Sequence, residues 1–390
     1  MPIRNISDLQ PMTGDIAPIT LEERLARIEK ARQLMVENQL DAIYLEPGSG
    51  LFYFTGVKWG RSERMMAAVI PAKGDLAYIC PAFEEARLRE LLLLGDDVRV
   101  WQENESPYAL AAGIFQDRAV RRVGIEESVR FFLFDGLRRA APHLELVSAD
   151  PVTIPCRAYK SPAEIALMQR AMDINLEAFK VAVSLLREGM SRFELESLVT
   201  SSHRALGGEE NFIDCQFGQH TAYPHGSPEP TRLKEGDVVL MDGGCTVEGY
   251  WSDMTRTFVF GRPTQRQREV WQVEKEAQAA AFAAAQVGAP CEAVDAAARR
   301  VITAAGFGPG YKTPGLPHRT GHGLGLDIHE WHHIVQGNQT PLAPGMCFSD
   351  EPMIAIYGEF GVRLEDCIYI TEADPRFFTP PSPSIEQPFA

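Results

Sequence analysis

The chain has 390 residues, of which 45% are hydrophobic and 23% are charged. This length exceeds what one hydrophobic core usually organises, and the composition is that of ordinary globular proteins, so we expect two folded domains and no global disorder. Acidic residues outnumber basic residues by 53 to 38, and the net charge of −15 argues against nucleic acid or an anionic membrane as a partner.

The sequence contains no stretch of about 18 apolar residues, and its start has neither a basic segment nor an apolar one. We therefore expect neither a membrane span nor an export signal. The seven cysteines are scattered and form no C-x-x-C pair, a pattern typical of free thiols in a reducing compartment. Together these features predict a cytoplasmic protein.

The pattern of helical and strand-like segments predicts three parts. They are a polar arm at residues 1–18, an amino-terminal domain at residues 19–156 and a carboxy-terminal domain at residues 157–390. The boundary between the domains lies where the periodicity lapses, around residues 153–161. After residue 371 the chain is rich in proline, and we expect this tail to lie extended on the surface.

Capping boxes indicate where several helices begin. A Ser or Thr followed three residues later by Glu or Gln satisfies two backbone N–H groups at a helix start, and this pattern follows Thr20, Ser161, Ser191 and Thr264. In the amino-terminal domain, helical segments alternate with strand-like runs, which predicts an α/β fold. The runs begin at residues 41, 67, 76, 98 and 123, and further helical segments cover residues 82–94 and 128–140.

The carboxy-terminal domain combines helices with two predicted strand pairs. The first pair lies between residues 237 and 260 and is joined by only a few residues, which favours a hairpin. The second pair lies between residues 352 and 370. Two helices separate the pairs, over residues 264–306, with a break at Gly288 and Pro290. A mixture of helices and antiparallel strands predicts an α+β fold for this domain.

Four acids and one histidine form a candidate metal site. Asp242 and Asp253 lie on the first strand pair, Glu351 and Glu365 on or beside the second, and His322 in a glycine-flanked turn. A single acid of this kind is usually an outward-facing strand residue or part of a salt bridge, but acids that interrupt apolar strands need neutralisation. Oxygen-rich ligands with one nitrogen suit Mn²⁺, Zn²⁺, Co²⁺ or Fe²⁺, and bridging carboxylates can hold two ions about 3.5–4 Å apart.

The segments around these residues resemble the pita-bread metallopeptidases, the family of prolidase, aminopeptidase P and methionine aminopeptidase. The resemblance covers about residues 155–372 and is carried by residues 225–226, 241–244, 250–257, 318–330, 350–352 and 362–366. It implies a pita-bread catalytic domain. A weaker resemblance to creatinase-type amino-terminal domains is carried by residues 53–56 with Trp59 and Arg61.

The resemblance implies a role for each of the five candidate ligands. Asp242 would chelate one metal ion, His322 and Glu351 would bind the other, and Asp253 and Glu365 would bridge the two. The implied cofactor is therefore two divalent metal ions per subunit, Mn²⁺ or Zn²⁺, with Co²⁺ as a further option. All five positions hold suitable ligand atoms, which argues against a relative that has lost its metals.

The resemblance also implies which residues act on the substrate. Glu351 would shuttle the proton to the leaving amine, and His225 and His329 would hydrogen-bond the substrate as the oxyanion forms. His318 belongs to the same pocket. Arg363 would orient a carboxylate ligand or meet the substrate terminus, with a structural ion pair as the alternative. The remaining histidines and two cysteines near the ligands are expected to be structural; they are His143, His203, His220, His332, His333, Cys245 and Cys367.

A long domain before the catalytic one favours prolidase or aminopeptidase P over methionine aminopeptidase. The resemblance thus implies a homodimer that cleaves bonds to the nitrogen of proline, and an Xaa-Pro dipeptidase is the reading we favour. Two departures leave the substrate open, because Met353 stands where the family commonly has glycine, and Asn211 or its neighbours stand where it has a pocket tyrosine. The alternatives are aminopeptidase P, which takes longer peptides, ectoine hydrolase or dimethylsulfoniopropionate lyase, and an inert binding protein.

Overall fold

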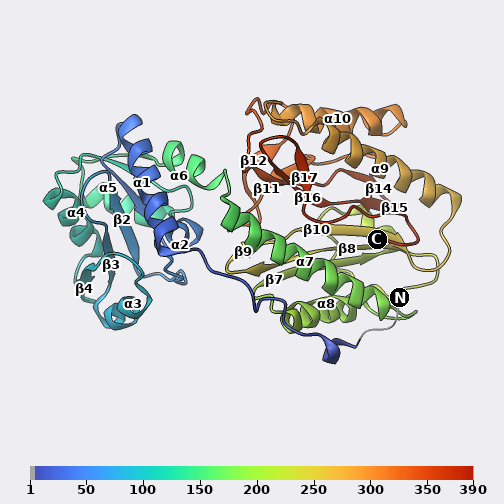
Figure 1. Cartoon of the computed structure of the whole chain (residues 1–390), viewed down its shortest axis with the longest axis horizontal. Helices are drawn as coiled ribbons and strands as arrows, with labels where there is room; N and C mark the ends of the chain where they lie inside the picture. The colour runs from blue at the N-terminus through green and yellow to red at the C-terminus, as the bar shows by residue number, and fades with distance from the viewer. Residues whose placement is uncertain (1–4, 390) are drawn as a thin grey trace. The chain divides into compact units, whose positions relative to one another are not determined.

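The computed structural model describes residues 5–389, which form two compact units (Figure 1). The amino-terminal unit is Ile19–Arg157, and the catalytic unit contains the residues from Ala158 onward together with the described residues before Ile19. The arm therefore packs on the catalytic unit. The Met12 N–H donates to the Leu206 carbonyl at 2.8 Å, and Asp15 forms an ion pair with Arg170 at 2.7 Å.

The amino-terminal unit is built on a mixed six-stranded sheet in the order β4-β3-β2-β1-β5-β6. Its strands are β1 Ala42–Leu45, β2 Ala67–Pro71, β3 Ala77–Pro81, β4 Asp97–Trp101, β5 Arg122–Ile125 and β6 Glu145–Ser148. Its helices are α1 Leu21–Glu37, α2 Ser49–Thr55, α3 Glu85–Leu91, α4 Pro107–Asp117, α5 Phe131–Ala140 and α6 Asp150–Arg157. The five predicted strands and the α/β class are confirmed, whereas β6, α2, α4 and α6 were not predicted.

The catalytic unit holds three sheets flanked by helices. A four-stranded sheet contains β7 Asn211–Phe217, β8 Val238–Val247, β9 Tyr250–Trp251 and β10 Met254–Val259. A five-stranded sheet contains β11 Gly321–Gly323, β12 Glu330–Ile334, β13 Cys347–Asp350, β16 Asp366–Ile370 and β17 Pro375–Phe377, and a hairpin joins β14 Met353–Ile356 to β15 Phe360–Arg363. Its α-helices are α7 Pro162–Ser184, α8 Arg192–Leu206, α9 Gln265–Ala284 and α10 Cys291–Ala304.

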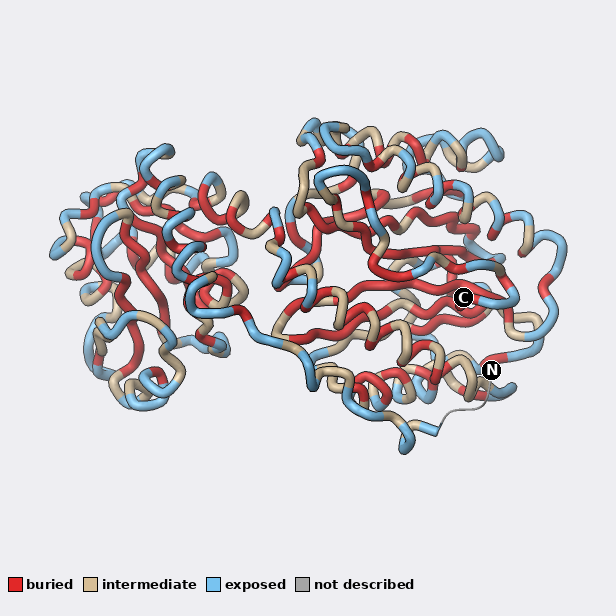
Figure 2. Tube along the Cα trace, viewed as in Figure 1, coloured by how far each residue is buried: buried red, intermediate tan, exposed pale blue. Residues whose placement is uncertain are grey.

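Helices cover the strands of the catalytic unit from opposite sides. In Figure 1, α7 and α8 lie along β8 and β7, and α9 and α10 lie on the far side of the sheets. Figure 2 shows strands buried along most of their length and helices exposed on their outer faces. Every predicted capping residue accepts a hydrogen bond at the start of its helix; these residues are Thr20, Ser161, Ser191 and Thr264.

The second predicted strand pair is split between two sheets. β14 and β15 pair with each other, but the neighbouring β13 and β16 pair in the five-stranded sheet. The chain therefore leaves one sheet for another at residues 351–352 and again at residues 364–365. A continuous strand over residues 362–370 was a wrong prediction, because alternating apolar residues do not reveal which partner strand takes each half.

Two other predictions were wrong for related reasons. Residues 153–161 were expected to lack periodicity, but α6 extends to Arg157 and buries Val152 and Cys156 on one side. The tail was expected on the surface, but β17 pairs with β16 and Ile385 packs into the hydrophobic core of the catalytic unit. Proline suggested exposure of the tail, and long-range packing outweighed that local signal.

In the described part of the chain, the helices are too short or too polar to cross a lipid bilayer.

One acidic side chain of α9, that of Glu274, lies inside the core of the catalytic unit. Glu274 is fully buried, and neither carboxylate oxygen makes a hydrogen bond of ordinary geometry. Burial raises the pKa of Glu274 well above its ordinary value of 4.5, while Arg363 and the Leu364 N–H lower it to a smaller extent. An acid whose pKa is raised by folding favours the folded state at low pH and loses that contribution as the pH rises through the folded pKa.

We expect Glu274→Met to stabilise the protein, by about 1–3 kcal/mol near neutral pH, because it removes a buried acid without partners. The gain should grow with pH, by up to about 1.4 kcal/mol per pH unit between the unfolded and folded pKa values. Urea unfolding at several pH values measures it, with the exposed Glu276→Met on the same helix as control. A gain that is equal at all pH values would contradict this account.

Candidate metal centre

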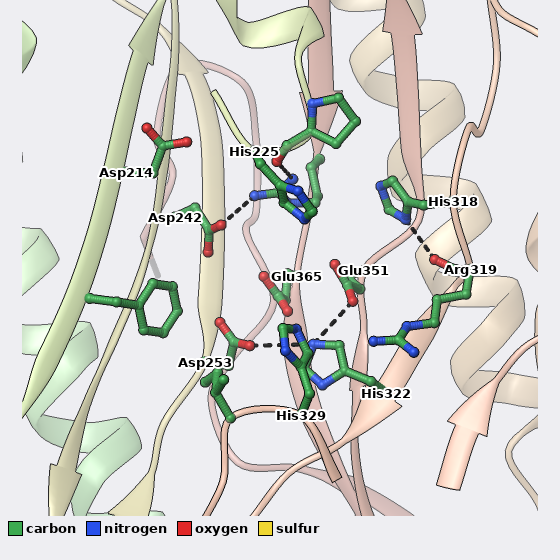
Figure 3. A pocket seen from close by; sticks show the side chains of 14 residues that line it. Asp214, His225, Asp242, Asp253, His318, Arg319, His322, His329, Glu351 and Glu365 are labelled. Atoms are coloured by element: carbon green, nitrogen blue, oxygen red, sulfur yellow. Dashed lines mark hydrogen bonds and ion pairs between the residues drawn. The ribbon is translucent and has the colours of Figure 1, made fainter. Parts of the chain in front are cut away.

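A cavity of about 580 Å³ lies in the catalytic unit. All nine residues that the sequence singled out line it, namely His225, Asp242, Asp253, His318, His322, His329, Glu351, Arg363 and Glu365. Five further lining residues are Phe212, Asp214, Pro224, Arg319 and Ile328. Residues that are far apart in the chain are thus brought to one place (Figure 3).

Interruptions of the strands direct three of the acids into this cavity. Asp253 lies between β9 and β10, Glu351 between β13 and β14, and Glu365 between β15 and β16. The backbone at these breaks is held by other strands, since the Glu351 N–H donates to the Thr320 carbonyl at 2.8 Å and the Glu365 N–H to the Thr255 carbonyl at 3.1 Å. Asp242 alone lies within a strand, β8, and His322 lies in the short strand β11 rather than in a turn.

The acids and the imidazole are close enough to share a cation. Asp253, His322 and Glu365 each offer one ligand atom, and these three atoms lie within 4.8 Å of one another. His322 Nε2 is 3.5 Å from Asp253 Oδ2 and 3.2 Å from Glu351 Oε1 (Figure 3). This geometry places one nitrogen among three carboxylates.

The protonation of His322 shows that these atoms fit a metal ion. His322 Nδ1 is 3.0 Å from the Gly323 carbonyl, which can only accept, so Nδ1 carries the hydrogen and Nε2 presents a lone pair. Burial, with a smaller contribution from His329, lowers the pKa of His322 well below its ordinary value, so the ring is neutral. A lone pair that faces carboxylate oxygens is repelled by them unless a cation lies between.

The carboxylates lead to the same conclusion. Burial is the largest cause that raises the pKa values of Asp253 and Glu365 well above the ordinary range, and the neighbouring acids raise them further. Burial also raises the pKa of Glu351 to about 7. Acids this crowded ionise together only when positive charge compensates them, and divalent cations supply it. The residues therefore fit the metal ions that the sequence motifs imply.

Arg363 holds one of these acids in place. Its Nη2 donates to Asp242 Oδ2 at 2.5 Å, its Nη1 to the Pro224 carbonyl at 2.7 Å and its Nε to Thr255 Oγ1 at 3.0 Å. Thr255 Oγ1 donates in turn to Glu365 Oε2 at 2.6 Å. Of the roles considered for Arg363, these contacts fit the orientation of carboxylate ligands better than contact with a substrate terminus.

The three pocket histidines differ in what they can donate. His318 Nδ1 is 2.6 Å from the Arg319 carbonyl, and burial lowers the pKa of His318 to about 4. The neutral ring therefore leaves Nε2 as an acceptor, unable to donate to a substrate carboxylate. His329 packs edge-to-face on His322 with ring centroids 4.2 Å apart, and His225 is exposed beside Pro224. His225 and His329 are thus accessible from the cavity.

The residues expected to be structural do not line the cavity. His203 is buried, with Nε2 2.9 Å from Asn175 Oδ1, and Cys245 and Cys367 are buried free thiols. Met353, which was expected to reshape the cleft, is fully buried in the core and does not line the cavity.

The sequence did not point to the five other residues that line the cavity. Asp214 and Phe212 lie on β7, a strand that was not predicted, and Asn211 at its start does not line the cavity. Arg319 could have been found, because it directly follows a histidine that was assigned to the pocket. Asp214 gave no such signal, since its place depends on the pairing of β7 with β8.

Comparison with known proteins agrees with this arrangement. Residues 166–372 match metallopeptidase family M24, and residues 27–159 match the creatinase/prolidase N-terminal domain. An Xaa-Pro dipeptidase of Lactobacillus helveticus is 33% identical over 363 residues, which is 90% of this chain and 96% of that protein.

Solved structures of similar proteins cover more than nine-tenths of the chain. Dipeptidase PepE from Mycobacterium ulcerans has a TM-score of 0.88 at 30% identity and covers 96% of this chain and 100% of that one. A prolidase from Thermococcus sibiricus has a TM-score of 0.85 at 30% identity and covers 93% of this chain and 98% of that one. The amino-terminal and catalytic units thus each have a counterpart in proteins with peptidase names.

We expect divalent metal to stabilise the protein more at high pH than at low pH. Without metal, the acids with raised pKa values stabilise the fold while protonated and lose that contribution as the pH rises. Metal binds only the ionised carboxylates, so its affinity falls as the pH falls. The gain in Tm on adding Mn²⁺ should be at least about 5 °C larger near pH 8 than near pH 5. Equal gains at both pH values would show that these acids do not bind the ion.

Proposed function

The chain belongs to metallopeptidase family M24, and from this premise we propose that it hydrolyses the Xaa-Pro bond of dipeptides with two divalent metal ions. The observation that supports the proposal best is the convergence of two buried acids, two half-buried acids and one neutral imidazole on a single cavity. The family acts on peptides and implies divalent metal ions. The preference for dipeptides and the use of two ions go beyond what the family implies and are our proposal.

We assign Asp242 to one ion, His322 and Glu351 to the other, and Asp253 and Glu365 to both. The shared 4.8 Å cluster and the 3.2 Å approach of Glu351 to His322 support this assignment. When bound, Mn²⁺ or Zn²⁺ supplies Lewis acidity, which acidifies water and polarises the scissile carbonyl. Four carboxylates match the charge of two divalent ions.

Glu351 is our candidate for the proton carrier. Its carboxylate lies at the cavity and accepts a hydrogen bond from Ser349 Oγ at 3.2 Å. A carboxylate at this position can take a proton and pass it on. The leaving nitrogen of proline must receive that proton, because an amide anion is a poor leaving group.

The other polar residues are assigned to substrate binding. His225 and His329 are accessible and can donate to the scissile carbonyl as negative charge develops on its oxygen. Arg319 lines the cavity, and its guanidinium makes no hydrogen bond or ion pair with any residue in 5–389. We assign the substrate carboxylate to Arg319, since Arg363 already donates to three protein groups. As the family resemblance implies, we propose a cytoplasmic homodimer.

The substrate is tested with a panel on purified, metal-loaded protein. We expect release of free proline from Ala-Pro, and at least about tenfold lower kcat/KM for Ala-Pro-Ala, because the unpaired Arg319 favours a carboxylate next to the scissile bond. A chelator should abolish hydrolysis, and Mn²⁺ or Zn²⁺ should restore it. Preference for the tripeptide would identify an aminopeptidase P, and turnover of ectoine alone would identify a non-peptidase.

Asp253→Ala tests the assignment of a bridging ligand. Removal of a carboxylate shared by both ions should lower metal content from about two ions per chain to less than one, and kcat by more than about 100-fold. Metal analysis and circular dichroism separate loss of ions from loss of fold. Glu229→Ala, an exposed acid outside the cavity, is the matched control. Full occupancy in the Asp253 variant would refute the bridge.

A further inference from the structure

We propose that Asp214 gives this enzyme a preference for substrates whose first residue carries a positively charged side chain, lysine or arginine. The inference rests on the proposed function, since it names the substrate class within the same cavity. It adds a contact for the side chain of the first residue to the groups assigned above.

Asp214 lies beside the proposed metal ligands without belonging to them. It pairs with Asp242 in the antiparallel register of β7 and β8, and residues directly opposite each other present their side chains on the same face of a sheet. Both line the cavity (Figure 3). The five assigned ligands all lie in the motifs at residues 241–244, 250–257, 318–330, 350–352 and 362–366, whereas Asp214 lies outside them on β7.

The charge of Asp214 is not needed by the metal ions. Of the five acids that line the cavity, four are assigned as ligands, and their charges are balanced by two divalent ions. Asp242 is further paired with Arg363 at 2.5 Å. Asp214 therefore remains as an extra negative charge at the side of the cavity formed by β7.

The protein neutralises this charge only in part. Arg192 Nη1 lies 2.9 Å from Glu196 Oε1 and 3.4 Å from Asp214 Oδ1, so one cation is shared by two carboxylates. The Gln216 amide donates to the same Oδ1 at 2.5 Å and brings no charge. Oδ2 makes no hydrogen bond or ion pair within residues 5–389, and 26% of the side chain is exposed. One net negative charge and one free oxygen remain for a ligand.

The opposite side of the cavity sets the direction of the substrate. Arg319 and His318 lie across from Asp214 in Figure 3, and the guanidinium of Arg319 has no protein partner. A dipeptide whose carboxylate is directed to Arg319 places its first residue toward β7, where Phe212 and Asp214 lie. A long apolar stem can pack on Phe212 while its charged end reaches the carboxylate of Asp214.

The side chain of the first substrate residue fits the contact with Asp214 better than the α-ammonium group of the substrate does. The α-ammonium is one carbon from the scissile carbonyl and must stay beside the metal ligands. Asp214 lies one strand further from them than Asp242, a spacing of about 4.8 Å. Only a group carried on a long side chain spans that distance while the carbonyl remains among the ligands.

The test compares Lys-Pro with norleucyl-proline, whose side chain has the same shape but no ammonium group, and with Glu-Pro. A charge-assisted hydrogen bond at a partly exposed site corresponds to about a 10- to 100-fold preference in kcat/KM for Lys-Pro over norleucyl-proline. Glu-Pro should be the poorest of the three. In Asp214→Asn we expect the preference to disappear, because kcat/KM should fall at least about tenfold further for Lys-Pro than for norleucyl-proline.

Glu210→Gln is the matched control, because it removes one exposed charge next to the start of β7 outside the cavity and should retain the preference. Competitive inhibition by free lysine against norleucine gives a second readout that needs no hydrolysis of the charged substrate.

Each outcome is decisive. A wild-type ratio near one, or a ratio that Asp214→Asn leaves unchanged, overturns the inference. An equal fall for both dipeptides in Asp214→Asn also overturns it, because it assigns the carboxylate to the α-ammonium. Hydrolysis of norleucyl-proline reports the proposed function separately, so absence of cleavage of all three dipeptides refutes that function, and with it the inference built on it.

Discussion

Four carboxylates line one cavity of the catalytic unit, and compensation of their mutual repulsion is the constraint on which the site depends. Asp253 and Glu365 are almost completely buried, and a neutral His322 presents a lone pair to the acids rather than a proton. No arrangement of these groups is stable with all charges present unless cations lie among them. The site therefore fits a metal ion, and the larger stabilisation by metal that we expect at high pH follows from the same repulsion.

The sheets are arranged to keep these groups together. Three of the four acids lie where a strand ends. Their side chains therefore need not point to alternate faces of a sheet, as they would within a continuous strand. Backbone hydrogen bonds from Glu351 and Glu365 to neighbouring strands hold the breaks rigid. Arg363 then links Asp242 to Thr255, and Thr255 links onward to Glu365. Geometry at the site is set by this network and not by any single strand.

Around the ligand set, the cavity has charge of opposite sign on opposite sides. Arg319 supplies an unpaired cation on one side, and Asp214 supplies a partly compensated anion on the other (Figure 3). A dipeptide with a carboxylate at one end and a cationic first side chain at the other would match this polarity. A net charge of −15 does not oppose the proposed binding of a carboxylate, since the local field and not the total charge acts over such distances.

Sequence alone determined the features that depend on local chemistry. Four helix starts followed from capping residues, and the proposed ligands were singled out because their motifs carry the resemblance; they are Asp242, Asp253, His322, Glu351 and Glu365, and all line one cavity. Only the tertiary structure decided which sheet each half of residues 362–370 joins, that Ile385 is buried, and that Asp214 lies opposite Asp242. These three features depend on hydrogen bonding and desolvation between segments that are distant in the sequence. A short stretch of sequence does not reveal which distant segment it will contact.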